Sequence, residues 1–324
     1  MGYLDSAKQK LRPHYRALKQ KKQADDYCSR YQKYAFDENG TLTEPEQFES
    51  CITRLYHMIE KGLAFPEYRA GFGANNIQKL LHHMERYAEK FDTTAFFYRT
   101  ALASLQAYIR KNREYGHEDP ELESRVSKLP GEPNDLGGVI SVRPLPLETV
   151  QSLGYADFVK SRHSVRHFSE TPVDIEKTKA AVALAQHTPS ACNRQGWKAR
   201  IVADPKVLSE LIKNQNGNRG FGEEINQMIV VTGDLRYFNQ DREQFQVFID
   251  GGMYAQSIIQ ALHYEGLAMI PLSASLWTEQ EQAVRQLLHI DDAEVLIMFI
   301  GVGNYVGECV TTRSERKPAQ ITVI

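Results

Sequence analysis

Two polar stretches decide how the second half of this chain reads: SRHSVRHF at residues 161–168 and PSACNRQGW at residues 189–197. The first brings two arginines, two histidines and a hydroxyl into six consecutive positions. Arginine offers a rigid fork of donors to a phosphate or a carbonyl edge, and serine adds a short donor. In the second stretch, small residues let a ligand approach the backbone, while Ser190, Asn193 and Gln195 supply hydroxyl and amide partners. These stretches predict a site for an anionic ligand with a planar, hydrogen-bonding head.

The residues around these stretches alternate between helix and strand patterns. The strand-like runs are short and continuously apolar, which indicates a sheet with both faces covered, in an α/β or α+β fold. The expected helices are 174–187, 206–214 and 251–265, and the expected strands are 198–204, 227–234 and 294–303.

Together these motifs resemble the nitroreductase family. That family's flavin-binding motifs read R-R/H-S-x-R/K and P-S-x-x-N-x-Q-P-W. This chain departs from the second at Gly196, where proline is usual, so we expect a looser loop before Trp197. The stretch 251–272 resembles the family's long central helix and the strand after it, and IMFIGVGNY followed by TTRSERKP resembles its final strand and basic tail. The resemblance covers residues from about 155 to 324.

The resemblance implies a site for FMN, assigned position by position. One set of residues would hold the ribityl-phosphate and the pyrimidine edge: Arg162, His163, Ser164 and Arg166. A second set would reach the flavin of the other subunit in a homodimer: Pro189, Ser190, Ala191, Asn193 and Gln195. A third set would pass the isoalloxazine face, with the backbone N–H of Ser273 near N5: Pro271, Leu272, Ser273 and Ala274.

Two further assignments complete the implied site. Gln215 and Asn218 lie where the family often has additional flavin contacts. Arg316 or Arg313 would pair with the phosphate; the family's second basic residue falls here on Ser314, so the choice between the two arginines stays open.

The implied activity is an FMN-dependent oxidoreductase. NADH or NADPH would reduce the flavin at N5 and leave, and a small acceptor (a nitroaromatic, a quinone or a dedicated metabolite) would then bind in a ping-pong cycle. No catalytic side chain is expected, because the cofactor carries the chemistry. The alternative is a non-catalytic or regulatory flavin-binding protein, whose helical half occupies the substrate space and binds a protein partner.

The first half of the chain has a different pattern. Residues 46–60, 75–91 and 94–112 predict amphipathic helices, and a proline- and glycine-rich break follows at 115–148. We therefore predict a helical N-terminal domain at 1–147 and an FMN-binding domain at 148–324. The fold class is α+β, with a central, mostly antiparallel sheet flanked by helices and an all-helical N-terminal domain.

One motif of the helical half remains open between two interpretations. Residues 56–63 (YHMIEKGL) and 69–73 (RAGFG) either form a capped connection between helices or carry His57, Glu60, Lys61 or Arg69 to the flavin pocket to select the substrate.

Composition excludes several other classes of protein. The net charge is -2, which argues against non-specific binding to nucleic acid. No apolar run reaches 18 residues and the first residues have no signal-like segment, so we expect no membrane contact and a cytoplasmic location. The 4 cysteines are far apart, which predicts no metal site. Cys192, inside the second motif, is either a small packing residue or a redox thiol.

Overall fold

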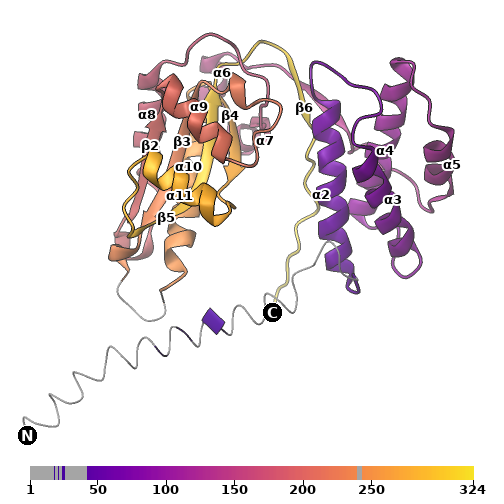
Figure 1. The fold of residues 1–324 in the computed structure, drawn as a ribbon, viewed down its shortest axis with the longest axis horizontal. Coiled ribbons are helices and arrows are strands. Elements are labelled where there is room, and N and C mark those ends of the chain that lie inside the picture. Colours follow the sequence, from indigo (N-terminus) through magenta and orange to yellow (C-terminus); the bar gives the residue numbers. More distant parts are fainter. Residues whose placement is uncertain (1–17, 19–20, 22–23, 26–41, 239–242) are drawn as a thin grey trace, which may run out of the picture. The chain divides into compact units, whose positions relative to one another are not determined.

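The computed structural model describes residues 18, 21, 24–25, 42–238 and 243–324. Contacts between residues group most of them into two compact units, which are described separately. The sheet unit is built on Arg143–Gly307, and the helical unit on residues 42–142 together with Glu308–Ile324. Figure 1 shows the elements of both units.

The sheet unit contains a four-stranded antiparallel sheet in the order β2-β3-β5-β4. Its strands are β2 (Trp197–Val202), β3 (Gln227–Asp234), β4 (Ala268–Ser273) and β5 (Glu294–Gly303). Every residue of the central strand β3 is buried, as its continuous apolar run predicts. An antiparallel sheet flanked by helices confirms the predicted α+β fold of this half.

The long helix α10 (Gln246–Tyr264) supplies much of the core of the sheet unit. Its Tyr254 stacks on Trp197 of β2, with ring centroids 4.7 Å apart and planes 10° from parallel. Helix α8 (Ile175–Ala185) packs on α10, and its small residues Ala181 and Ala185 are buried where the helices meet. Asp174 caps α8 by accepting the Glu176 N–H.

Shorter elements complete the sheet unit. Helix α9 (Pro205–Asn214) begins after Asp204, which accepts two backbone N–H groups, and Pro205 occupies its first turn. The helices are α6 (Leu147–Ser152), α7 (Tyr155–Ser161), α9 (Pro205–Asn214) and α11 (Thr278–Leu287), with 3₁₀ turns η1 (Ala191–Asn193), η2 (Gly222–Glu224) and η3 (Leu235–Tyr237).

The helical unit contains four helices and a two-stranded antiparallel sheet. The helices are α2 (Pro45–Leu63), α3 (Ala74–Ala88), α4 (Phe96–Glu114) and α5 (Pro120–Lys128), and the strands are β1 (Val139–Val142) and β6 (Cys309–Thr312). Its core is rich in aromatic rings. The ring centroid of Tyr87 lies 5.8 Å from that of Phe48 and 5.6 Å from that of Tyr98. None of the described helices in either unit is both long and apolar enough to span a membrane.

The structure differs from the sequence-based expectations at the break between the halves. Helix α5 lies inside the proline-rich stretch, because Asp119 accepts the Leu122 N–H and Pro120 occupies the first helical position, where its missing N–H costs nothing. Strand β1 also lies in this stretch and pairs with β6, so the helical unit includes a two-stranded sheet that the sequence did not predict. Consequently the tail after Gly307 groups with the helical unit, whereas the predicted domains 1–147 and 148–324 place it with the other half.

Candidate functional site

The segment 162–166 leaves the C-terminal end of α7 in an extended conformation and runs beside β4. The Val165 N–H donates to the Met269 carbonyl at 3.0 Å, and the Val165 side chain is fully buried. Arg162, His163, Ser164 and Arg166 are half-buried. Downstream, Glu224 accepts the Phe168 N–H at 3.0 Å and contacts Nδ1 of His167 at 2.6 Å. The arginine-bearing segment is therefore fixed from both sides.

His263 of α10 lies directly beneath the start of this segment. Its Nε2 is 2.8 Å from the Ser161 hydroxyl, and its ring lies 5.0 Å from that of Phe158. The Ser161 oxygen also lies 2.9 Å from the Phe158 carbonyl, so this hydroxyl links His263 to the last turn of α7. Burial, together with the smaller effect of the nearby charges of Arg162 and His163, lowers the pKa of His263 to about 4. The imidazole is therefore neutral near pH 7.

The turn after α9 is tied to the end of β4. The Gln215 side-chain amide donates to the Ser273 carbonyl at 2.9 Å and accepts the Gly217 N–H at 2.7 Å. The Asn218 amide donates to the carbonyls of Ile212 at 2.8 Å and Gln215 at 2.7 Å. Both side chains are buried, 4% and 7% exposed. Their visible role is to hold this turn against β4; contact with a flavin stays a prediction for both.

The end of β4 carries the third predicted set. Pro271 and Ala274 are half-buried, Leu272 is buried and Ser273 is exposed. The Ser273 hydroxyl accepts the Ser275 N–H at 2.9 Å, which turns the chain sharply after the strand. Segments 162–166, 215–218 and 271–274, far apart in the sequence, thus meet along one strand.

The loop 189–195 is built differently from these three segments. Cys192, Asn193 and Gln195 have φ of 53°, 55° and 52°, a left-handed conformation that costs free energy in residues other than glycine. Asp250 of α10 accepts the Ala191 N–H at 3.2 Å, and the Ser190 hydroxyl accepts the Gln195 N–H at 3.0 Å. The backbone is therefore held in an unusual shape by side chains.

Further contacts of this loop concern its polar side chains. The Gln195 amide donates to Asn193 Oδ1 at 3.0 Å. Arg194 forms a two-pronged ion pair with Glu243 at 2.8 and 2.9 Å, and hydrogen bonding to that carboxylate raises the pKa of Arg194. Pro189 lines a pocket of about 320 Å³ between α7, α8 and α10. Approach of this loop to the flavin of a second subunit stays a prediction.

The two candidate phosphate ligands lie in the helical unit. The Arg313 N–H donates to the Gly138 carbonyl at 3.2 Å, and its Nε lies 3.7 Å from Glu315. Arg316 is exposed, and its guanidinium donates to the Ser314 carbonyl. Which of them would hold a phosphate stays open.

The substrate-selecting interpretation of residues 56–63 is wrong for Glu60. Its side chain is completely buried inside the helical unit, where it accepts the Gly138 N–H at 3.1 Å and lies 3.4 Å from Nδ1 of His57. A carboxylate enclosed in this way fixes the chain entering β1 and cannot contact a substrate. In the parts of the chain that the structure describes, no group of three or more His, Cys, Asp or Glu side chains is arranged to hold a metal ion.

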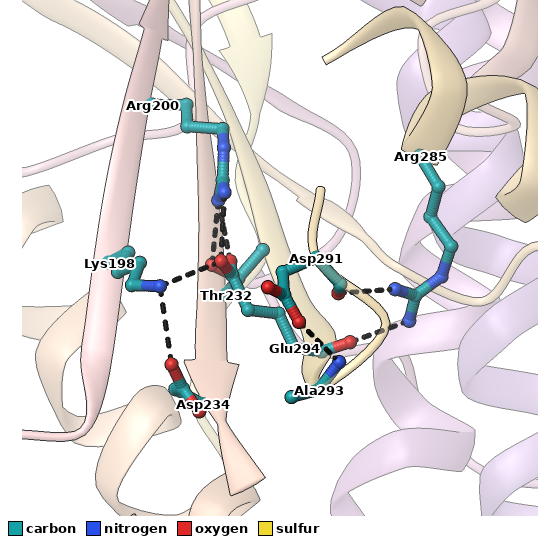
Figure 2. A network of polar contacts seen from close by, with 8 residues as sticks. All are labelled: Lys198, Arg200, Thr232, Asp234, Arg285, Asp291, Ala293 and Glu294. Atoms are coloured by element: carbon teal, nitrogen blue, oxygen red, sulfur yellow. Dashed lines mark hydrogen bonds and ion pairs between the residues drawn. The ribbon is translucent and has the colours of Figure 1, made fainter. Parts of the chain in front are cut away.

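A second polar cluster in the sheet unit is a stabilising network (Figure 2). Glu294, 1% exposed, accepts from Lys198 at 2.8 Å, Arg200 at 2.7 Å and the Thr232 hydroxyl at 2.6 Å. Burial raises the pKa of Glu294, but these donors outweigh it and lower the pKa to about 2. Lys198 also donates to Asp234 at 3.2 Å, so two cations face two carboxylates and the cluster ties β2, β3 and β5 together.

Sequence reasoning missed the residues that position the candidate site. His263, Asp250 and Glu224 each hold the backbone or the helix end next to a predicted ligand segment. The available signal was a polar residue inside an otherwise apolar helix, as for Asp250 and His263 in α10. That pattern marks a buried polar group but does not name its partner.

Comparisons with known proteins point to one family for the second half of the chain. The model of the nitroreductase family matches residues 159–216 and 205–304. A chloronitrobenzene nitroreductase from Comamonas testosteroni is 23% identical over 194 residues, 45% of this chain and 85% of that protein.

Two solved structures are similar to parts of the chain. An NADH dehydrogenase/NAD(P)H nitroreductase from Parabacteroides distasonis is 25% identical, with a TM-score of 0.44 over 50% of this chain and 92% of that one. A nitroreductase from Desulfovibrio desulfuricans in complex with FMN is 17% identical, with a TM-score of 0.43 over 54% and 92%. The nitroreductase-family model thus covers residues 159–304, under half of the chain, and the likeness to that family applies to this part.

Proposed function

We propose that this chain is an FMN-dependent oxidoreductase that takes a hydride from NADH or NADPH and passes it, in a ping-pong cycle, to a small acceptor such as a nitroaromatic or a quinone. The observation that carries the proposal is the meeting of segments 162–166, 215–218 and 271–274 along β4 in the part of the chain that this family's model matches. The relative that matches over 85% of its own length is named for the reduction of a nitroaromatic compound.

The donors present fit the proposed cofactor. Arg162 and Arg166 offer planar forks suited to phosphate and to the carbonyls of a flavin's pyrimidine edge, and Ser164 adds a hydroxyl. All three are half-buried, which strengthens their interactions with an anion compared with those at a fully exposed surface. FMN, when bound, supplies hydride transfer at its N5.

The protein's own role would be to hold the cofactor and to orient the segments that bind it. Val165 anchors the arginine segment to β4, and Gln215 fixes the Ser273 carbonyl. His263, neutral near pH 7, supports the end of α7 through its contact with the Ser161 hydroxyl. Positive charge from the arginines next to the pyrimidine edge would favour the reduced, anionic form of a bound flavin. No acid–base pair of side chains is required.

We also propose a homodimer with composite sites. Helix α10 leaves a row of large apolar side chains in contact with solvent, with exposures of 48% for Phe248, 54% for Ile249 and 37% for Met253. These positions recur at helical spacing along one face, which suits burial against a second copy. Loop 189–195 is anchored to the same helix through Asp250, so association along α10 would carry that loop toward the partner's site.

The test is reduction of the reconstituted protein without oxygen. After addition of FMN and removal of the excess, NADH or NADPH should bleach the bound flavin, and a quinone or nitroaromatic should restore its colour. Flavin that binds but is not reduced by either nucleotide would favour the regulatory flavin-binding alternative. Protein that retains no flavin would contradict both.

A further inference from the structure

A second pocket lies within the helical unit, where α2 ends and the chain crosses to α3. Its volume is about 430 Å³, which is within the range of small-molecule sites. Its lining comes from one continuous piece of chain: Gly62, Phe65, Glu67, Tyr68, Arg69 and Phe72. This is the distinctive motif of the N-terminal half, and the proposed flavin chemistry does not use it.

The wall of this pocket is held in place from behind. Asn112 of α4 is buried, and its side-chain oxygen Oδ1 accepts both the Tyr68 hydroxyl at 2.7 Å and the Gly71 N–H at 2.9 Å. The Tyr108 hydroxyl donates to the Phe72 carbonyl at 2.7 Å. Three hydrogen bonds from one helix thus fix a connection of the kind that usually varies in shape, which prepares its side chains for a ligand.

Close packing adds to this rigidity. A Cβ atom on Gly62 would lie 1.9 Å from the Phe72 ring, so the ring can sit against the helix end only because position 62 is glycine. Lys111 lies 5.7 Å from the centroid of the Tyr68 ring, which fixes that ring by a cation–π contact. The pocket therefore offers aromatic surface in a set orientation.

The charges at the rim have opposite signs and no partners in the described chain. Neither Glu67 nor Arg69 forms an ion pair or a side-chain hydrogen bond with another described residue. Gly62 places the C-terminal end of α2 at the same pocket, and the carbonyls at a helix end attract positive charge. The lining thus offers a negative group that suits an ammonium and a positive group that suits a carboxylate.

We propose that this pocket binds a small zwitterion with an aromatic side chain, that is, a free aromatic α-amino acid. The ammonium group lies between Glu67 and the end of α2, the carboxylate pairs with Arg69, and the ring packs against Phe65, Tyr68 and Phe72. A ligand that carries both charges pairs with both rim residues. A simple acid pairs only with Arg69 and a simple amine only with Glu67, so one rim charge stays without a partner. This site is independent of the proposed flavin chemistry.

The experiment is isothermal titration calorimetry on the full-length protein with three probes. L-phenylalanine carries both charges, 2-phenylethylamine lacks the carboxylate, and 3-phenylpropionate lacks the ammonium group. Arg69→Gln and Glu67→Gln remove one rim charge each at exposed positions, so the fold should be unaffected. Arg110→Gln, on the exposed side of α4, is the matched control.

The expected result is a crossed pattern. Arg69→Gln should weaken the binding of L-phenylalanine and 3-phenylpropionate by at least about tenfold and leave the binding of 2-phenylethylamine unchanged. Glu67→Gln should weaken L-phenylalanine and 2-phenylethylamine and leave 3-phenylpropionate unchanged. The proposal is overturned if wild-type protein shows no saturable binding of L-phenylalanine at millimolar concentration, or if both variants bind it as well as the control does. Because the readout is heat of binding, failure of the flavin proposal would not alter it.

Discussion

Among the residues that the structure describes, each unit buries one glutamate almost completely, and the two glutamates are stabilised in different ways. Glu294 in the sheet unit is 1% exposed and is surrounded by Lys198, Arg200 and the Thr232 hydroxyl. Glu60 in the helical unit is 0% exposed, and its contacts are a backbone N–H of Gly138 and the ring of His57.

The difference shows what burial of a carboxylate can be used for. Two cations make Glu294 part of an ion network that joins three strands, so its charge is essential to that network. Glu60 mainly provides an acceptor for one N–H at the entry to β1, which a neutral group could also do. The first arrangement stabilises through charge, and the second specifies the path of the chain.

The largest effect is expected from Glu294→Gln. Lys198 keeps Asp234 as a partner, but the half-buried Arg200 loses its carboxylate, and we expect a loss of about 3 kcal/mol of unfolding free energy. Urea denaturation measures it, with the exposed Glu279→Gln on α11 as control, which should change stability by less than about 0.5 kcal/mol. If Glu294→Gln were as stable as the control, the network would contribute nothing.

The same network predicts a dependence on pH. The pKa of Glu294 is lowered to about 2 from an ordinary value of 4.5, so its stabilising contribution is complete above pH 4.5 and is lost as pH falls toward 2. The stability difference between wild type and Glu294→Gln should therefore shrink through that interval. A difference that stayed constant down to pH 2.5 would show that the carboxylate charge is not what stabilises the folded state.

The next largest effect concerns FMN binding, which should depend on an arginine of the sheet unit and not on one of the helical unit. Arg162→Ala in the sheet unit should weaken FMN binding by about 1.5 to 3 kcal/mol, roughly tenfold to a hundredfold, because a charge-assisted hydrogen bond is lost. Arg110→Ala on α4 of the helical unit should leave FMN affinity unchanged. Quenching of flavin fluorescence on titration measures both. Equal affinities for the two variants would remove Arg162 from the proposed site.

A smaller effect is expected at His263. In His263→Phe the contact with Phe158 is kept but the hydrogen bond to Ser161 is lost, so FMN affinity should fall by about 1 kcal/mol, roughly fivefold. The pKa of His263 is lowered from 6.5 to about 4, so wild-type stability falls as pH drops from 6.5 toward 4, and this part of the fall should be missing in the variant. Identical stability profiles in both proteins would contradict a buried, neutral histidine.

The fold of the sheet unit was largely predictable, for a physical reason. Strands β3 and β5 have the predicted bounds 227–234 and 294–303, because they are long, continuous apolar runs. The strand pair β1–β6 was not predicted, since each strand has only 4 residues and the partners Val142 and Cys309 are far apart in the sequence. Short strands have no periodic signal, and their pairing depends on the rest of the fold.

The residues proposed to bind the cofactor could be predicted from the sequence, but the residues that hold them in place could not. A basic stretch with a serine, such as 162–166, is visible in sequence because it is chemically unusual. The use of Gln215 to hold the Ser273 carbonyl depends on two segments meeting in space, so no local pattern encodes it. The same holds for the left-handed residues of loop 189–195, whose shape is imposed by Asp250 on another helix.

The smallest effect is expected from Glu60→Gln, and it is the direct counterpart of the first prediction. Glutamine keeps a carbonyl oxygen for the Gly138 N–H, and the nearest titratable group, Nδ1 of His57, lies at 3.4 Å, so the loss should be about 0.5 to 1 kcal/mol. Glu60→Leu removes this acceptor and leaves the Gly138 N–H with only the Ser104 hydroxyl, at 3.2 Å, so it should cost about 1 to 2 kcal/mol. Urea denaturation of the two variants separates a requirement for an acceptor from a requirement for charge. If Glu60→Gln destabilised the protein as much as Glu294→Gln does, the two buried carboxylates would stabilise through charge alike.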